Sequence, residues 1–114
     1  MKAARWYQAR DIRIDDIEEP TVSAGKVKIK VAWTGICGSD LHEYLAGPIF
    51  VPVDKPHKIS GDIAPIVMGH EFSGEVVEVG SGVTKFKAGD RVVVEPILSC
   101  QECEACREGK YNLC

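Results

Sequence analysis

Alternation of apolar and polar residues is clearest in the segment from Lys26 to Trp33, where lysines occupy every second position at first. A period of two is typical of a strand with one face in water and the other against a core. We expect this strand to bury Val27, Ile29, Val31 and Trp33. The strand runs directly into Gly35 and Cys37.

The same alternation predicts a strand over residues 11–15, and short apolar runs predict strands over residues 2–8, 72–79 and 91–94, the last of them buried. Ser39 or Asp40 is expected to cap a short helix over Leu41 to Leu45. A long irregular stretch, 47–65, holds four of the six prolines. Several short strands with turns between them predict a mostly β fold with short helices, a small β-barrel forming a single domain.

Composition narrows the functional classes. A formal charge of −3 and a pI near 5.6 argue against a nucleic-acid binder. No apolar run approaches the roughly 20 residues that a membrane-spanning helix needs. The segment from Met1 to Gln8 lacks the apolar core of a signal peptide, so a cytoplasmic location is expected. In a reducing compartment, clustered cysteines are metal ligands more often than disulfides.

Four of the five cysteines lie within the last fifteen residues, at positions 100, 103, 106 and 114. Thiolates prefer soft or borderline metals, and four of them form a closed tetrahedral zinc site. Because a closed site has no open position, its expected role is structural. The predicted ligands of this structural zinc are Cys100, Cys103, Cys106 and Cys114.

Three alternatives to this zinc site exist, and the cysteine spacing argues against the first two. A bacterial ferredoxin run has three residues before its last cysteine and then a proline, whereas this chain has seven residues there. A nucleic-acid zinc ribbon needs two cysteine pairs about 15–20 residues apart. Four unligated buried thiols are the remaining possibility.

A second group of metal-binding residues is spread along the chain. Cys37 and His70 are both flanked by glycine and follow or precede predicted strands, and Glu71 is next to His70. A thiolate and an imidazole with an open position fit a catalytic zinc, and Asp40 could orient His70 through its second ring nitrogen. From the residues alone an equal alternative stays open, in which Cys37 is a small buried apolar residue and His70 a core histidine.

The order of four motifs resembles one enzyme family. The motifs are Gly35 to His42, Gly69 to Val77, Gly89 to Val92 and the four-cysteine segment, and together they span nearly the whole chain. This chain resembles the zinc-containing medium-chain alcohol dehydrogenase superfamily. Within it, the segment from Asp40 to Phe50 is most similar to the (R,R)-2,3-butanediol dehydrogenases, with the threonine and sorbitol dehydrogenases as near relatives.

The resemblance implies a GroES-like β-barrel with a four-cysteine structural zinc lobe. It implies that Cys37 and His70 bind a catalytic zinc, and that Glu71 is a close carboxylate that coordinates in some states. It implies that Ser39 passes the alcohol proton onward and that His42 carries this proton to solvent. Ile49 and Phe50 are candidates for an apolar wall of the substrate pocket.

The implied reaction is hydride transfer between NAD or NADP and a small secondary alcohol, diol or ketone, with 2,3-butanediol and acetoin as the expected pair. Nucleic acid and membranes are not expected partners. The sequence has no Gly-x-Gly-x-x-Gly after a strand. Residues 1–114 are therefore expected to be the N-terminal part of a catalytic domain, without the cofactor-binding Rossmann domain.

From this we expect residues 1–114 alone to be inactive, and the full-length enzyme to be a homo-oligomer. Sorbitol-type or threonine-type dehydrogenase activity is the alternative within the family. The alternative outside it is a non-catalytic, zinc-stapled GroES-like module. The co-occurrence of Cys37, Ser39, His42, His70 and Glu71 favours an enzyme, since a structural barrel needs none of them.

Overall fold

The computed structural model of the protein describes all residues from 1 to 114. Its regular elements, in chain order, are β1 (Lys2–Gln8), β2 (Asp11–Asp16), β3 (Val27–Thr34), α1 (Gly38–Ala46), β4 (Ile66–Val67), β5 (Phe72–Val79), β6 (Arg91–Val93), α2 (Glu104–Arg107) and a 3-10 turn, η1 (Tyr111–Leu113). The predicted strands are confirmed to within one or two residues. No helix is long and apolar enough to cross a lipid bilayer.

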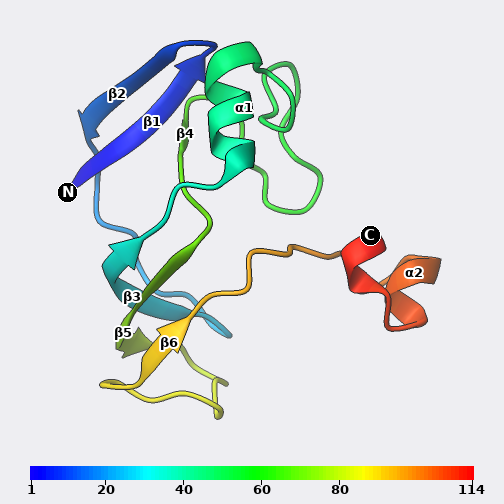
Figure 1. The fold of residues 1–114 in the computed structure, drawn as a ribbon. Helices are drawn as coiled ribbons and strands as arrows, with labels where there is room; N and C mark the ends of the chain where they lie inside the picture. The colour runs from blue at the N-terminus through cyan, green and yellow to red at the C-terminus, as the bar shows by residue number, and fades with distance from the viewer.

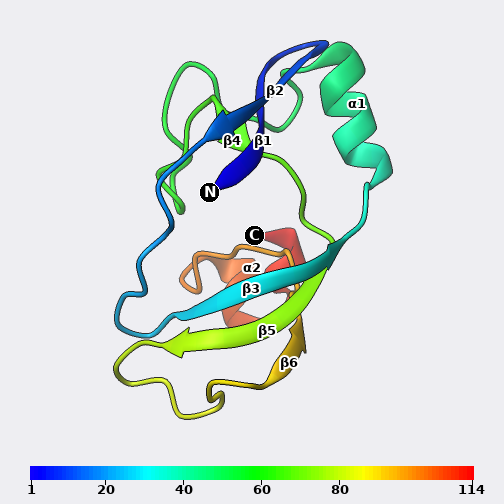
Figure 2. The same cartoon turned by 90° about the vertical axis from the view of Figure 1, so that its left-hand side faces the viewer.

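The strands form two separate antiparallel sheets, in the orders β2-β1-β4 and β3-β5-β6. Figure 1 shows the first sheet beside α1 and the second below it, and Figure 2 shows the open space between the ribbons of the two sheets. The mostly β prediction is confirmed. The strands of residues 1–114 do not close into a barrel, because the two sheets share no strand.

The chain passes between these sheets three times. The first passage, residues 17–26, joins β2 to β3. The second, 35–65, joins β3 to β4 and contains α1. The third, 68–71, joins β4 to β5 and is the shortest.

The buried core is small, with six of the 114 residues buried, so most sheet surface is only partly covered. Trp6 and Val76 are the largest fully buried side chains, one in each sheet. The Trp6 indole Nε1 donates a hydrogen bond of 3.1 Å to the backbone carbonyl of Glu43. This contact fixes α1 against the first sheet.

The prediction that all apolar residues of the third strand face a core is wrong at its C-terminal half. Val31 is 54% exposed and Trp33 is 81% exposed, whereas Val27 and Ile29 are half-buried. The predicted buried strand at 91–94 is wrong in the same way, since Val93 is 83% exposed. Both strands belong to the second sheet, β3-β5-β6. No other element of residues 1–114 covers the outer face of this sheet.

Helix α1 begins three residues earlier than predicted, at Gly38, with Cys37 as its N-cap. The Asp40 carboxylate reaches back and accepts the backbone N–H of Cys37 at 2.9 Å. Asp40 is therefore the third residue of the helix, where an acidic side chain can satisfy a free N–H of the first turn. The prediction of Ser39 or Asp40 as the cap residue is wrong for this reason.

Candidate metal centre and substrate pocket

The pairing of β3 with β5 places the candidate metal ligands next to each other. Thr34 is opposite Phe72 at the end of the ladder, and the N–H of Gly35 donates to the carbonyl of Glu71 at 2.7 Å. A Cβ at Gly35 would lie 2.9 Å from a carboxylate oxygen of Glu71, so a larger residue there would move the end of the Glu71 side chain. Cys37 and His70, 33 positions apart in sequence, meet just beyond this point.

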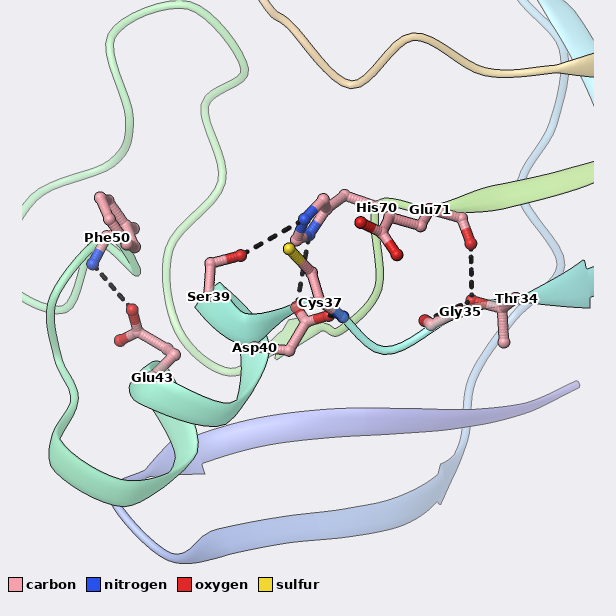
Figure 3. Close-up of polar contacts among 9 residues, drawn as sticks. All are labelled: Thr34, Gly35, Cys37, Ser39, Asp40, Glu43, Phe50, His70 and Glu71. Carbon is pink, nitrogen blue, oxygen red and sulfur yellow. Dashed lines mark hydrogen bonds and ion pairs between the residues drawn. The ribbon is translucent and has the colours of Figure 1, made fainter.

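The thiol of Cys37, the imidazole of His70 and the carboxylate of Glu71 form one cluster. One potential ligand atom from each lies within 4.8 Å of the others, as Figure 3 shows for the side chains. A thiolate, an imidazole and a carboxylate are all zinc ligands, and three protein ligands leave the fourth tetrahedral position open. These residues fit a zinc ion that binds a substrate molecule in its open position.

Asp40 and Ser39 contact the two nitrogens of the His70 ring. Asp40 Oδ1 lies 3.3 Å from Nδ1, and Ser39 Oγ lies 3.3 Å from Nε2. A carboxylate at Nδ1 favours a proton on that nitrogen, which leaves the lone pair of Nε2 available to a metal. The predicted orienting contact between Asp40 and His70 is therefore present (Figure 3).

The hydrogen bonds of this cluster favour the zinc-binding thiolate of Cys37 but also favour the protonated form of His70, which a metal would have to displace. Hydrogen bonding to the Ser39 hydroxyl, then to its backbone N–H and to His70, lowers the pKa of the Cys37 thiol. The hydrogen bond with Cys37 raises the pKa of His70, and the Asp40 and Glu71 carboxylates add to this rise while burial opposes it. A lowered thiol pKa increases the fraction of thiolate, which is the form that binds zinc.

His42 lies apart from the cluster. It is exposed on α1 and forms no hydrogen bond to Ser39, although the two residues are three apart on one helix. The relay through His42 stays a prediction.

A cavity of about 420 Å³ adjoins the cluster. Ser39 and His70 line one side of it, and apolar residues of the long loop and of β4 line another. The apolar lining residues are Phe50, Val51, Ile66, Val67 and Met68. Phe50, which the sequence suggested as a pocket wall, is among them, and Ile49 is not.

Glu43 also lines this cavity and was missed by the sequence analysis. Its side chain is 3% exposed, the only buried charged residue of the chain. The sequence pattern gives no signal for it, because an acid after His42 on a short helix is indistinguishable from a solvated one.

The four cysteines of the C-terminal segment form a second cluster. Their sulfur atoms lie within 4.8 Å of one another, and no disulfide joins them. The sulfurs of Cys100 and Cys106 are 4.0 Å apart, close to the roughly 3.8 Å expected for two thiolates on a tetrahedral zinc with bonds of about 2.3 Å. The cluster thus fits a closed zinc site, held by α2, η1 and the turn before α2.

Backbone N–H groups around this second cluster favour thiolate. Hydrogen bonds from the N–H groups of Glu102 and Cys103, together with one from the thiol side chain of Cys114, lower the pKa of Cys100 to about 6. Burial and the neighbouring thiols raise the pKa of Cys106 to about 11. Without a metal, the closely spaced sulfurs are expected to share their remaining protons. Binding of a zinc ion would release these protons.

Comparison with known proteins decides the family. A family model described as "Alcohol dehydrogenase GroES-like domain" matches residues 23–114. The chain belongs to this family. The GroES-like prediction is therefore confirmed, and the open sheets are those of a GroES-like alcohol dehydrogenase domain.

Individual relatives agree with this assignment. The chain is 66% identical over 113 residues to an (R,R)-butanediol dehydrogenase of Bacillus subtilis, covering 99% of this chain and 32% of the relative. It is 48% identical to a sorbitol dehydrogenase of the same species, covering 100% of this chain and 30% of the relative. A crystal structure of 2R,3R-butanediol dehydrogenase from Bacillus subtilis superposes with a TM-score of 0.90 at 65% identity, over 98% of this chain and 31% of that one.

The chain spans about a third of the length of the relatives that it matches.

Proposed function

We propose that residues 1–114 are the zinc-binding, N-terminal part of the catalytic domain of an NAD(P)-dependent alcohol dehydrogenase, with 2,3-butanediol and acetoin as substrate and product. The observation that carries this proposal is the cluster of Cys37, His70 and Glu71 beside Ser39 and a partly apolar cavity. The identity of 66% to an (R,R)-butanediol dehydrogenase supports the choice of substrate.

Each residue of the site has a proposed task in this reaction. Cys37, His70 and Glu71 would hold the catalytic zinc. When bound, zinc supplies a Lewis acid that lowers the pKa of an alcohol or polarises a ketone. Asp40 Oδ1 lies 3.3 Å from Nδ1 of His70 and would keep the ring proton on that nitrogen. The lone pair of Nε2 would then be available to the metal.

Ser39 is the proposed proton acceptor for the substrate hydroxyl. The Ser39 Oγ lies 3.3 Å from Nε2 of His70, and Ser39 also lines the cavity. A hydroxyl can accept one proton while donating its own, so Ser39 can move a proton away from the reacting oxygen. His42, exposed on the same helix, is the proposed route to solvent.

The hydride acceptor, NAD or NADP, belongs to the proposal for the whole protein, because oxidation of an alcohol to a ketone must transfer a hydride. We propose that a Rossmann domain elsewhere in the full-length protein binds it. A structural zinc at Cys100, Cys103, Cys106 and Cys114, a homo-oligomeric full-length enzyme and a cytoplasmic location complete the proposal.

The test is turnover by the full-length protein with its zinc. Reduction of NAD or NADP would be followed over a range of concentrations of (R,R)-2,3-butanediol, sorbitol and threonine in parallel. The proposal expects the highest kcat/KM with the butanediol, and loss of activity in the Cys37→Ser variant. Preference for sorbitol, which the identity of 48% to a sorbitol dehydrogenase favours, would contradict the substrate. No turnover of any alcohol would favour a non-catalytic GroES-like module.

A further inference from the structure

Glu43 has an unusual environment for a carboxylate. Its side chain is 3% exposed and has no lysine, arginine or histidine within ion-pair distance. Burial of an unpaired carboxylate is costly unless hydrogen bonds compensate for the lost water. The neighbours of Glu43 must therefore supply those hydrogen bonds.

Two backbone N–H groups of the following loop supply them. The N–H of Ile49 donates to Glu43 Oε1 at 2.9 Å, and the N–H of Phe50 donates to Oε2 at 2.8 Å. Each carboxylate oxygen thus holds one of two successive peptide groups. Hydrogen bonds to an ionised acceptor are about twice as strong as neutral ones.

The backbone of Glu43 is fixed as well. Its carbonyl accepts the Trp6 indole N–H at 3.1 Å and the N–H of Gly47 at 2.9 Å. A Cβ at Gly47 would overlap this carbonyl, the Glu43 carboxylate and the Trp6 ring, so a larger residue there would displace the helix end. The loop is held by a residue that is itself anchored to the core.

The loop that Glu43 holds forms a wall of the cavity beside the metal cluster. Phe50 and Glu43 line that cavity together with Ser39 and His70. The Phe50 side chain is 74% exposed, so few contacts of its ring fix it in place. Figure 3 shows the hydrogen bond from the Phe50 backbone to Glu43, with Ser39 one helical turn nearer to His70. The position of this aromatic ring thus depends on its backbone, and the backbone depends on Glu43.

From these contacts we infer that Glu43 is a positioning residue of the substrate pocket, which sets the place of Phe50 against the apolar part of the bound alcohol. This inference rests on the proposed function, since it assigns the cavity to substrate. It does not make Glu43 a catalytic residue. Its carboxylate is turned to the loop, and both oxygens are already engaged there.

The test compares three variants of the full-length zinc enzyme. E43Q keeps the shape of the side chain but turns an NH₂ group toward one of the two backbone donors, so one hydrogen bond is lost. W6F removes the indole donor and weakens the same region without changing the carboxylate. E78Q changes an exposed glutamate on β5 that has no hydrogen-bond partner and serves as the neutral control.

Two readouts separate a pocket role from a structural one. Amide hydrogen exchange at Ile49 and Phe50 should become at least about tenfold faster in E43Q, in line with the loss of a charged hydrogen bond. KM for 2,3-butanediol should rise at least about fivefold while kcat changes less than about twofold, because uniform binding is lost rather than transition-state stabilisation. W6F should lower the melting temperature but leave KM near that of E78Q.

Unchanged exchange in E43Q would overturn the inference, and so would faster exchange with an unchanged KM. An equal KM increase in W6F would also overturn it, because general loosening would then suffice. If the unmodified enzyme prefers sorbitol or threonine, the assigned substrate is wrong. The KM comparison is then made with the preferred alcohol, with the same outcomes for Glu43.

Discussion

At the scale of residues, the site depends on short contacts within one helical turn. Cys37 is the N-cap of α1, the Asp40 carboxylate accepts its N–H, and the Ser39 hydroxyl lies 3.3 Å from Nε2 of His70. Three proposed roles, namely metal binding, proton transfer and orientation of a ligand, thus fall on Cys37, Ser39 and Asp40, within four neighbouring positions. A change at any of them alters the electrostatics of the others.

Substitution of Ser39 by alanine tests this coupling. The Ser39 hydroxyl is the largest cause of the lowered pKa of Cys37, so S39A should raise that pKa toward its ordinary value. In metal-free protein, alkylation of Cys37 by iodoacetamide should slow severalfold in S39A near pH 7, because less thiolate is present. At a pH above both pKa values, the two rates should converge.

The measurement is a pH series of alkylation rates, with each cysteine quantified by peptide mass spectrometry. Leu45→Ala, an exposed residue of the same helix, is the matched control and should keep the original pH profile. Identical profiles for S39A and the unmodified protein would show that Ser39 does not set the reactivity of Cys37.

At the scale of elements, the four-cysteine segment is the least self-supporting part of the chain. No residue from 94 to 114 is fully buried, and its helix α2 has only four residues. Apolar burial therefore contributes little to the stability of this lobe. We expect the proposed zinc to supply its order, as in small zinc-dependent domains.

Removal of one thiolate should therefore unfold this lobe. We expect Cys103→Ser to lose one zinc per chain, and proteolytic cleavage between residues 100 and 114 to become much faster. Cys37→Ser is the matched variant, which should lose the other zinc and keep the lobe protected. Zinc is counted by elemental analysis, and cleavage sites are mapped by mass spectrometry. Visible absorbance of an iron–sulfur cluster in the unmodified protein would contradict the zinc assignment.

Elements were also where the sequence was most informative. Alternation located β2 and β3, since side-chain period is a property of the strand itself, and short apolar runs located β1, β5 and β6. Alternation also indicates which residues share a face, but not whether another element covers that face. Trp33 was misassigned for this reason.

The residues of the candidate site also differ in whether local sequence or tertiary contacts determine their roles. The four clustered cysteines could be predicted from their spacing, whereas the pairing of Cys37 with His70 needed the family resemblance, because a lone cysteine or histidine is often a core residue. Glu43 could not be predicted, because its role depends on which backbone amides the loop turns toward it. That information is set by the path of residues 47–50, where no periodic pattern exists.

At the scale of the whole molecule, residues 1–114 leave a broad apolar sheet face exposed. Trp33, Ser73 and Val93 lie in one row across β3, β5 and β6, and the two apolar members are 81% and 83% exposed. Exposed apolar surface on a sheet with open edges favours association. The polypeptide of residues 1–114 is therefore expected to self-associate.

A charged residue on this face should reduce that association. W33K is expected to shift the 114-residue polypeptide toward monomer in size-exclusion chromatography with light scattering. Ile14→Lys, which replaces an exposed apolar residue of the other sheet, is the matched control and should have a smaller effect. Equal effects of the two variants would show that overall charge, rather than the Trp33 face, governs association.

The passages between the two sheets have a mechanical consequence. Cys37 lies in the passage that leaves the second sheet, and His70 and Glu71 lie in the short passage that returns to it. Ligands from both passages lie in one cluster, so an ion bound there would cross-link the segments that connect the two sheets. The candidate metal centre would then also limit the relative motion of the two sheets. Loss of its ion would allow the sheets, and with them the walls of the cavity, to move more freely.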